Sequence, residues 1–192
     1  MKKVLSILIA LVLTLGCAAA FAETEAEAFA KLPEEIQIDY GSTVELYVNG
    51  IQAVKNPDGS LTDDELAELK EDLGLAAECD FVGYAITDLN GDGKDDLVIA
   101  SGTLILAVYS YGTDENGEYV SFPVMESTET VRFYYAGEGK FADVTLVNGE
   151  PAYETACVWT ADGEIPDLGP ENRVAPEYYQ QLALFPVYPL AD

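Results

Sequence analysis

Two short apolar runs frame a polar loop near the middle of the chain. Residues 81–86 read FVGYAI and residues 97–100 read LVIA, while residues 88–96 between them are mostly Asp, Asn and Gly. Apolar runs of this length, rich in β-branched and aromatic side chains and bounded by turn residues, are typical of buried strands. The pattern therefore predicts a strand, a loop and a second strand.

The second half of the chain repeats this alternation of apolar runs and turns. Five further runs predict strands: residues 104–111, 119–125, 130–136, 141–147 and 152–159. Gly-containing turn signals such as Asn116-Gly117 and Asn148-Gly149 separate them. The regular spacing predicts an antiparallel meander. Its frequent Tyr and Phe residues suit core and cross-strand packing, or else a ligand-facing sheet surface.

The remaining segments predict helices and loose ends around this sheet. Residues 23–35 read as a flexible acidic lead-in, and residues 36–54 favour a strand or hairpin, with a helix as the alternative. Residues 62–73 carry a capping box and predict an N-terminal helix. Residues 176–184 predict a short C-terminal helix that ends before Pro186, followed by a loose tail. The predicted fold class is α+β, mostly antiparallel β.

The central loop has the spacing of a calcium-binding loop. Side-chain oxygens stand at loop positions 1, 3, 5 and 9, supplied by Asp88, Asn90, Asp92 and Asp96. Calcium takes six to eight oxygen ligands at roughly 2.3–2.6 Å. A glycine at position 6 allows a sharp turn that points the carbonyl of Lys94 inward. The alternative is an acidic surface hairpin, since Asn-Gly and Asp-Gly are common turn dipeptides.

The flanks distinguish this loop from an EF-hand, which has a helix on each side and a bidentate Glu at position 12, where this chain has Ile99. The loop resembles the cation loop of FG-GAP repeats. It also resembles the single such loop of small secreted proteins from clostridial-type Gram-positive bacteria, most of unassigned function. The matching residues are Asp88, Asn90, Asp92, Gly93, Asp96 and Leu97.

The resemblance implies an exported calcium-binding module at the cell surface. No repeat of fixed period is present, so it extends to the loop and not to a propeller fold.

A second stretch, residues 56–65, has part of the same spacing. Asn56, Asp58, Thr62 and Glu65 occupy positions 3, 5, 9 and 12 of an EF-hand-like loop, but Val54 at position 1 has no side-chain oxygen. The stretch therefore reads first as a turn that leads into the capped helix, with a second cation site as the alternative.

The N-terminus predicts export. Residues 1–22 combine a charged start, an apolar stretch over residues 4–15 and a small-residue cleavage site at Ala20-Phe21-Ala22. Cleavage before Cys17 to give a lipid-anchored protein is the alternative. After export, residues 36–192 are predicted to form a single globular domain, and no later segment is long enough to span a bilayer.

The net charge limits the classes of partner that the protein can bind, and the cysteine content bears on whether it has a disulfide. All 35 acidic residues follow the signal, and 9 − 2 = 7 basic residues remain, so the mature chain carries a net charge of 7 − 35 = −28. Such a charge repels nucleic acid and anionic lipid and attracts cations. Export permits a disulfide between Cys79 and Cys157, although both could equally be buried thiols.

The absence of histidine from the sequence excludes a Ser-His or Cys-His nucleophile. No phosphate-binding or dinucleotide motif is present. A glycosidase needs only two carboxylates, a condition that a chain with 35 acidic residues always meets, so their presence does not indicate an enzyme. Because no carboxylate pair flanked by aromatic residues stands out, we expect no enzyme activity, and a small carboxylate-based glycosidase is the less favoured alternative. The sequence predicts an exported, acidic, Ca²⁺-binding protein that acts as a binding or adhesion module, with cell-wall glycan or a surface protein as candidate partners. The alternative is an accessory protein that uses calcium only to stabilise its fold.

Overall fold

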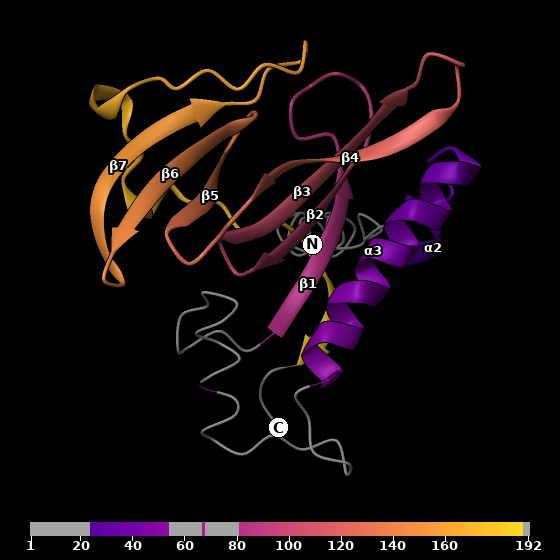
Figure 1. The fold of residues 1–192 in the computed structure, drawn as a ribbon, viewed down its shortest axis with the longest axis horizontal. Helices are drawn as coiled ribbons and strands as arrows, with labels where there is room; N and C mark the ends of the chain where they lie inside the picture. The colour runs from indigo at the N-terminus through magenta and orange to yellow at the C-terminus, as the bar shows by residue number, and fades with distance from the viewer. Residues whose placement is uncertain (1–23, 54–66, 68–80, 190–192) are drawn as a thin grey trace, which may run out of the picture.

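The computed structural model describes residues 24–53, 67 and 81–189. An eight-stranded antiparallel sheet dominates these residues, with strand order β7-β6-β5-β3-β2-β1-β8 and β4 paired to β3 beside this path (Figure 1). The strands are β1 (Phe81–Thr87), β2 (Asp96–Ser101), β3 (Leu104–Thr113), β4 (Tyr119–Glu126), β5 (Val131–Gly137), β6 (Lys140–Val147), β7 (Glu150–Val158) and β8 (Phe185–Pro189). The prediction of a mostly antiparallel β fold is confirmed.

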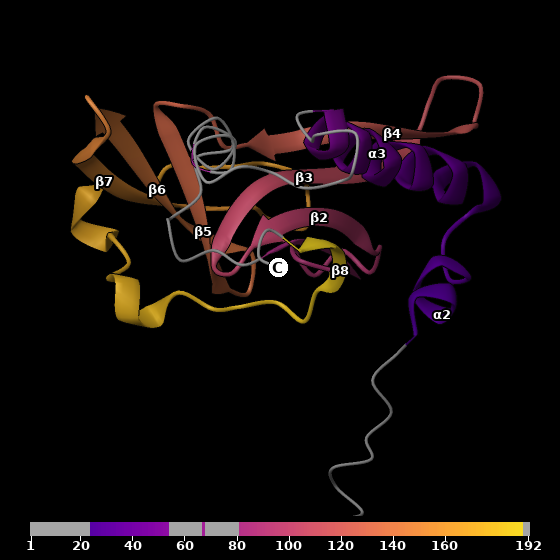
Figure 2. The ribbon, with the colours of Figure 1, turned by 90° about the horizontal axis from the view of Figure 1, so that it is seen from below.

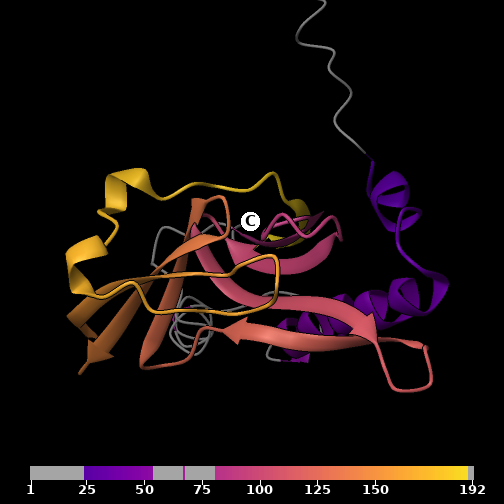
Figure 3. The same cartoon turned by 90° about the horizontal axis from the view of Figure 1, so that it is seen from above.

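The long strand β3 joins the two halves of the sheet. One of its edges pairs with β2, while the other pairs first with β5, through Ile105 and Phe133, and then with β4, through Ser110 and Phe122. The two halves therefore diverge along β3, and the sheet curls from β8 around to β7 (Figures 2 and 3). This curl brings the end of β7 close to the loop between β1 and β2.

Helix α3 (Glu34–Ala53) replaces the strand or hairpin that the sequence favours for residues 36–54, so that prediction is wrong. Ile36 and Tyr40 are fully buried and Val44 packs against the same core, whereas Ile38 and Leu46 are exposed. Burial at every fourth residue is the period of a helix. The short alternation at residues 44–48 is a minor feature of this longer pattern.

A second helix lies within the predicted flexible lead-in. Helix α2 (Glu25–Phe29) begins at a capping box in which Thr24 and Glu27 exchange hydrogen bonds. Ala28 is buried, and the Phe29 ring meets Tyr84 edge-on at 6.1 Å. A lead-in of this composition is expected to be frayed or weakly helical, and the structure shows the helical form, whose apolar side chains reach the core on one face of the sheet.

The predicted C-terminal helix is reduced to a single 3₁₀ turn, η2 (Pro176–Tyr178), which follows another such turn, η1 (Pro170–Asn172). Gln180 then bonds to the end of β5, its N–H to the Tyr135 carbonyl at 2.8 Å and its amide to the Ala136 carbonyl at 3.1 Å. These bonds keep the chain extended. The tail, predicted to be loose, forms β8 at the sheet edge, where prolines are tolerated.

Some predictions fall outside the described residues. These are the signal segment at residues 1–22, the capped helix at residues 62–73 apart from Ala67, the second cation loop at residues 56–65, and Cys17 and Cys79. Within the described part of the chain, no helix has the length and apolarity needed to cross a bilayer.

Candidate functional site

The predicted calcium loop connects β1 to β2 and starts directly after their last paired residues, Thr87 and Asp96. Asp88 organises the turn, because its carboxylate accepts the N–H of Gly91 at 2.7 Å and that of Gly93 at 2.9 Å. Both glycines have positive φ, at 77° and 85°, a conformation that side chains rarely adopt. The glycine positions are therefore a requirement of the turn.

The next two ligand candidates fold back on the loop in the same way. The Asn90 side-chain oxygen accepts the N–H of Asp92 at 3.2 Å, and the Asp92 carboxylate accepts the N–H of Lys94 at 2.8 Å. These Asx turns place the oxygens of positions 1, 3 and 5 along one short loop. The Lys94 ammonium lies 3.5 Å from Asp92 and 3.4 Å from the Tyr111 carbonyl.

Asp96 is the unusual member of the set because its side chain is 0% exposed. One carboxylate oxygen accepts the Leu89 N–H at 3.1 Å, while the other, Oδ1, has no hydrogen-bond partner among the described residues. Burial raises the pKa of Asp96 to about 7, and repulsion from Asp92 and Asp88 adds to the increase. The Leu89 N–H and the Ser110 hydroxyl lower the pKa, but the hydroxyl is near the carboxylate without forming a hydrogen bond to Oδ1. A buried carboxylate oxygen without a partner is costly.

Within the described residues, no group of three or more acidic or thiol side chains is gathered closely enough to hold a metal ion as it stands. The donor set nevertheless fits calcium in kind, since it offers carboxylate, amide and carbonyl oxygens without nitrogen or sulfur ligands. The Asp96 oxygen without a partner is the observation that fits the binding of a cation, because a cation would satisfy it.

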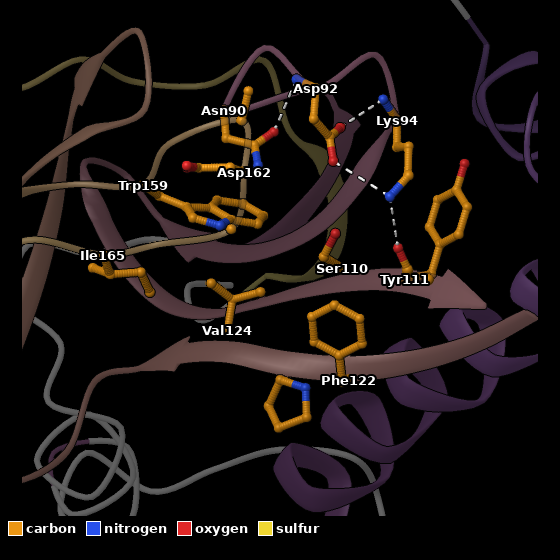
Figure 4. Close-up of a pocket in the computed structure, with 14 residues that line it drawn as sticks. Asn90, Asp92, Lys94, Ser110, Tyr111, Phe122, Val124, Trp159, Asp162 and Ile165 are labelled. Atoms are coloured by element: carbon orange, nitrogen blue, oxygen red, sulfur yellow. Dashed lines mark hydrogen bonds and ion pairs between the residues drawn. The ribbon is translucent and has the colours of Figure 1, made fainter. Parts of the chain in front are cut away.

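A hollow of about 370 Å³ lies beside the loop, between it and strands β3 and β4 (Figure 4). Its polar side is formed by Asn90, Asp92, Lys94, Ser110 and Asp162, and its apolar side by Tyr111, Phe122, Val124, Trp159 and Ile165. Asn90, Asp92 and Lys94 thus belong both to the loop and to the wall of the hollow.

The loop and the turn before β6 both contact the segment at the end of β7. The Asn90 amide donates to the Thr160 carbonyl at 3.2 Å. Gly139, in the turn before β6, accepts the Trp159 N–H at 2.7 Å, and a side chain there would come within 2.5 Å of the Trp159 carbonyl and 3.4 Å of the Leu89 carbonyl. Three segments distant in sequence therefore meet at this point, beside the hollow.

The structure brings Asp88, Asn90, Asp92 and Lys94 together in one loop, with Asp96 buried at its base. It leaves the predicted disulfide open: Cys157 is buried in the core, and Cys79 lies outside the described residues. Burial, with added repulsion from Asp143 and Asp167, raises the pKa of the Cys157 thiol to about 11.

Sequence reasoning missed the residues that complete the hollow, namely Ser110, Phe122, Trp159 and Asp162. Only the single tryptophan of the chain and the Asp162-Gly163 turn offered a signal, and neither pointed to the loop. Comparisons of the chain with protein-family models, with curated proteins and with solved structures found no match.

Proposed function

We propose that this is an exported calcium-binding protein, in which the loop at residues 88–96 binds one Ca²⁺ ion. The observation that carries the proposal is the buried Oδ1 of Asp96, the last residue of the loop, which has no partner among the described residues. Asp88, Asn90, Asp92 and Asp96 would contribute side-chain oxygens, and Lys94 its backbone carbonyl, with water completing the shell.

The local charges support a divalent ion. Without it, Asp88 and Asp92 repel Asp96, as their effect on its pKa indicates. The Lys94 ammonium offsets part of the charge of Asp92, but its side chain is 45% exposed, so the pairing is weak. An ion with two charges inside the loop would relieve the repulsion and link binding to folding.

The adjoining hollow favours a binding module over a protein that uses calcium only to stabilise its fold. Asn90 and Asp92 line the hollow as well as the loop. An ion that orients these two side chains would also shape the wall of the hollow. The proposed role is therefore a calcium-dependent binding surface on an exported protein.

Isothermal calorimetry of the mature chain, after treatment with EDTA, tests calcium binding. We expect one site, with a dissociation constant of about 10⁻⁴–10⁻³ M, as in other extracellular calcium modules. Asp92→Ala should abolish the binding heat. Asp114→Ala is the matched control, because Asp114 caps the β3–β4 hairpin by accepting the N–H groups of Asn116 and Glu118 and is remote in sequence from the loop. The absence of binding heat in the wild type would refute the proposal.

Mass spectrometry of the protein released from its producing cells tests export separately. Cleavage after Ala22 gives a chain that begins at Glu23. A diacylated Cys17 would instead establish a lipid anchor and reject soluble export. The calorimetric result does not depend on this outcome.

A further inference from the structure

We propose that the hollow beside the loop binds one uncharged sugar ring, with its apolar C–H face toward Phe122 and its hydroxyl edge toward the loop. The inference rests on the proposed calcium function, since calcium would orient two of the residues that face the sugar. It goes further by assigning a ligand class to a surface lined by residues from the loop, from β3 and β4, and from the segment after β7 (Figure 4).

The size and apolar lining of the hollow fit a sugar ring. Small-molecule sites usually have volumes of roughly 300–1,000 Å³, and this one has about 370 Å³. Phe122 is 45% exposed and Ile165 is 41% exposed, so both offer apolar surface to a ligand. Trp159 is only 3% exposed and forms part of the wall of the hollow. Sugar rings with equatorial hydroxyls present flat C–H faces, which pack well against aromatic rings.

The polar side offers the mixture of donors and acceptors that hydroxyl groups require. Asn90 provides an amide, Asp92 and Asp162 provide carboxylates, and Lys94 provides an ammonium. A hydroxyl both donates and accepts, so it can bond to each of these groups. Asn90 and Asp162 each have one partner at Thr160, and Asp92 has one at Lys94. Amide, carboxylate and ammonium groups keep further donor or acceptor capacity, which a sugar hydroxyl can use.

Charge favours an uncharged ligand. An anionic sugar would meet the repulsion of a chain with a net charge of −26. A cationic group would meet the Lys94 ammonium, which lies 3.5 Å from Asp92 and 5.8 Å from the centre of the Tyr111 ring. Lys94 therefore already occupies the position where an acid and an aromatic ring would attract a cation.

The single tryptophan of the chain allows a direct measurement. We would titrate the mature protein with cellotetraose and with chitotetraose, in calcium and in EDTA, and follow Trp159 fluorescence. We expect a saturable change with a dissociation constant in the millimolar range for at least one of them, weaker by several-fold in EDTA. Phe122→Ala should remove the response. Val120→Ala should keep it, because Val120 lies on the same strand, is 41% exposed and does not line the hollow.

Three outcomes would overturn the inference. The first is no fluorescence response to either tetrasaccharide. The second is an equal response in Phe122→Ala and wild type. The third is a response only to Nα-acetyl-lysine methylamide, used as a cationic probe. If calorimetry detects calcium while both tetrasaccharides fail, the saccharide inference fails and the calcium function stands. If the tetrasaccharides bind and calcium does not, the hollow is a sugar site and the proposed calcium function fails.

Discussion

Asp96 is the residue at which the energetics of the loop can be tested most directly. In EDTA, Asp96→Asn should raise the melting temperature, because it removes a buried, ionisable group whose Oδ1 has no partner in the described residues. In millimolar calcium, Asp96→Asn should instead melt at a lower temperature than the wild type, since the substitution removes both a negative charge and a ligand oxygen. Differential scanning calorimetry under the two conditions measures this crossover.

Asp95→Asn provides the control for Asp96→Asn. It removes the same charge from the adjacent position, but Asp95 is only partly buried and is not a proposed ligand. We expect a small, parallel shift of the melting temperature in EDTA and in calcium. A variant at Asp96 that behaves like this control would contradict the role of Asp96 as a ligand.

Cys157 should be an unreactive thiol in the folded protein. Its pKa is raised from 9.0 to about 11, so at a pH below 9 it carries about a hundredfold less thiolate than an ordinary cysteine. The unfolded chain loses this proton first as the pH rises from about 9 to 11, so the contribution of Cys157 to stability is present below that window and declines across it. Alkylation of the reduced Cys79→Ser protein by iodoacetamide, in native buffer and in urea, checks the expected protection. Equally fast alkylation in both would contradict it.

The predicted disulfide is checked by counting thiols in denaturant without reductant. The mature chain has two cysteines, Cys79 and Cys157, so two titratable thiols would exclude the bridge. No titratable thiol would support it. The count is independent of the alkylation experiment, in which Cys79 is replaced.

The loop could be predicted from the sequence because its chemistry is local. Asp88 and Asp92 bond to N–H groups within five residues of themselves, so their spacing alone encodes the turn. The burial of Asp96 could not be predicted in this way. It results from packing across the sheet, near Ser110, which the spacing of the loop does not encode.

At the level of elements, helix α3 shows where the sequence pattern misled. A five-residue alternation favoured a strand, whereas the buried Ile36 and Tyr40 and the partly buried Val44 follow the helical period over about two turns. The Tyr40 hydroxyl donates to the Tyr109 carbonyl at 3.1 Å, which anchors the helix to β3. Such contacts lie 69 residues apart, and a short window of sequence does not contain them.

Substitutions on opposite faces of α3 test its packing. Ile36→Ala removes a fully buried side chain and should cost about 2–5 kcal/mol. Ile38→Ala, at a position that is 65% exposed, should change stability by less than about 0.5 kcal/mol. Urea denaturation followed by circular dichroism measures both. Equal effects would contradict the helical packing and favour the alternation of a strand.

The turn at Gly139 brings the β5–β6 hairpin close to the loop at residues 88–96. Gly139 and Gly149 both have positive φ, at 70° and 80°, so alanine is strained at either position. Only at Gly139 would the new side chain collide with backbone, at 2.5 Å from the Trp159 carbonyl. Gly139→Ala should therefore cost about 1–3 kcal/mol more than Gly149→Ala. Urea denaturation measures the difference, and equal costs would contradict the close approach.

At the scale of the whole molecule, the curled sheet determines which segments meet. Asn90 and Thr160 are 70 residues apart, yet they share a hydrogen bond because β7 returns toward the loop. The strand segments were predictable from apolar runs and turns. Their order in the sheet, and with it the hollow, depends on long-range pairing that the apolar pattern does not specify.

The net charge of the mature chain, 7 − 35 = −28, provides the last prediction. Self-repulsion at this charge destabilises the compact state, so sodium chloride should raise the melting temperature by screening alone. Calcium chloride at the same ionic strength should raise it further. Specific binding of calcium should add RT ln(1 + [L]/Kd) to the free energy of unfolding, which is about 0.4–1.4 kcal/mol at millimolar calcium for a Kd of about 10⁻⁴–10⁻³ M.

Magnesium chloride is the control for specific binding. It should raise the melting temperature about as much as sodium chloride does, because magnesium prefers a strict octahedron and keeps its waters. In Asp92→Ala, calcium and magnesium should give equal shifts, since only non-specific effects remain. Equal shifts by the two ions in the wild type would mean that the loop is an acidic turn and that calcium acts only on the overall charge.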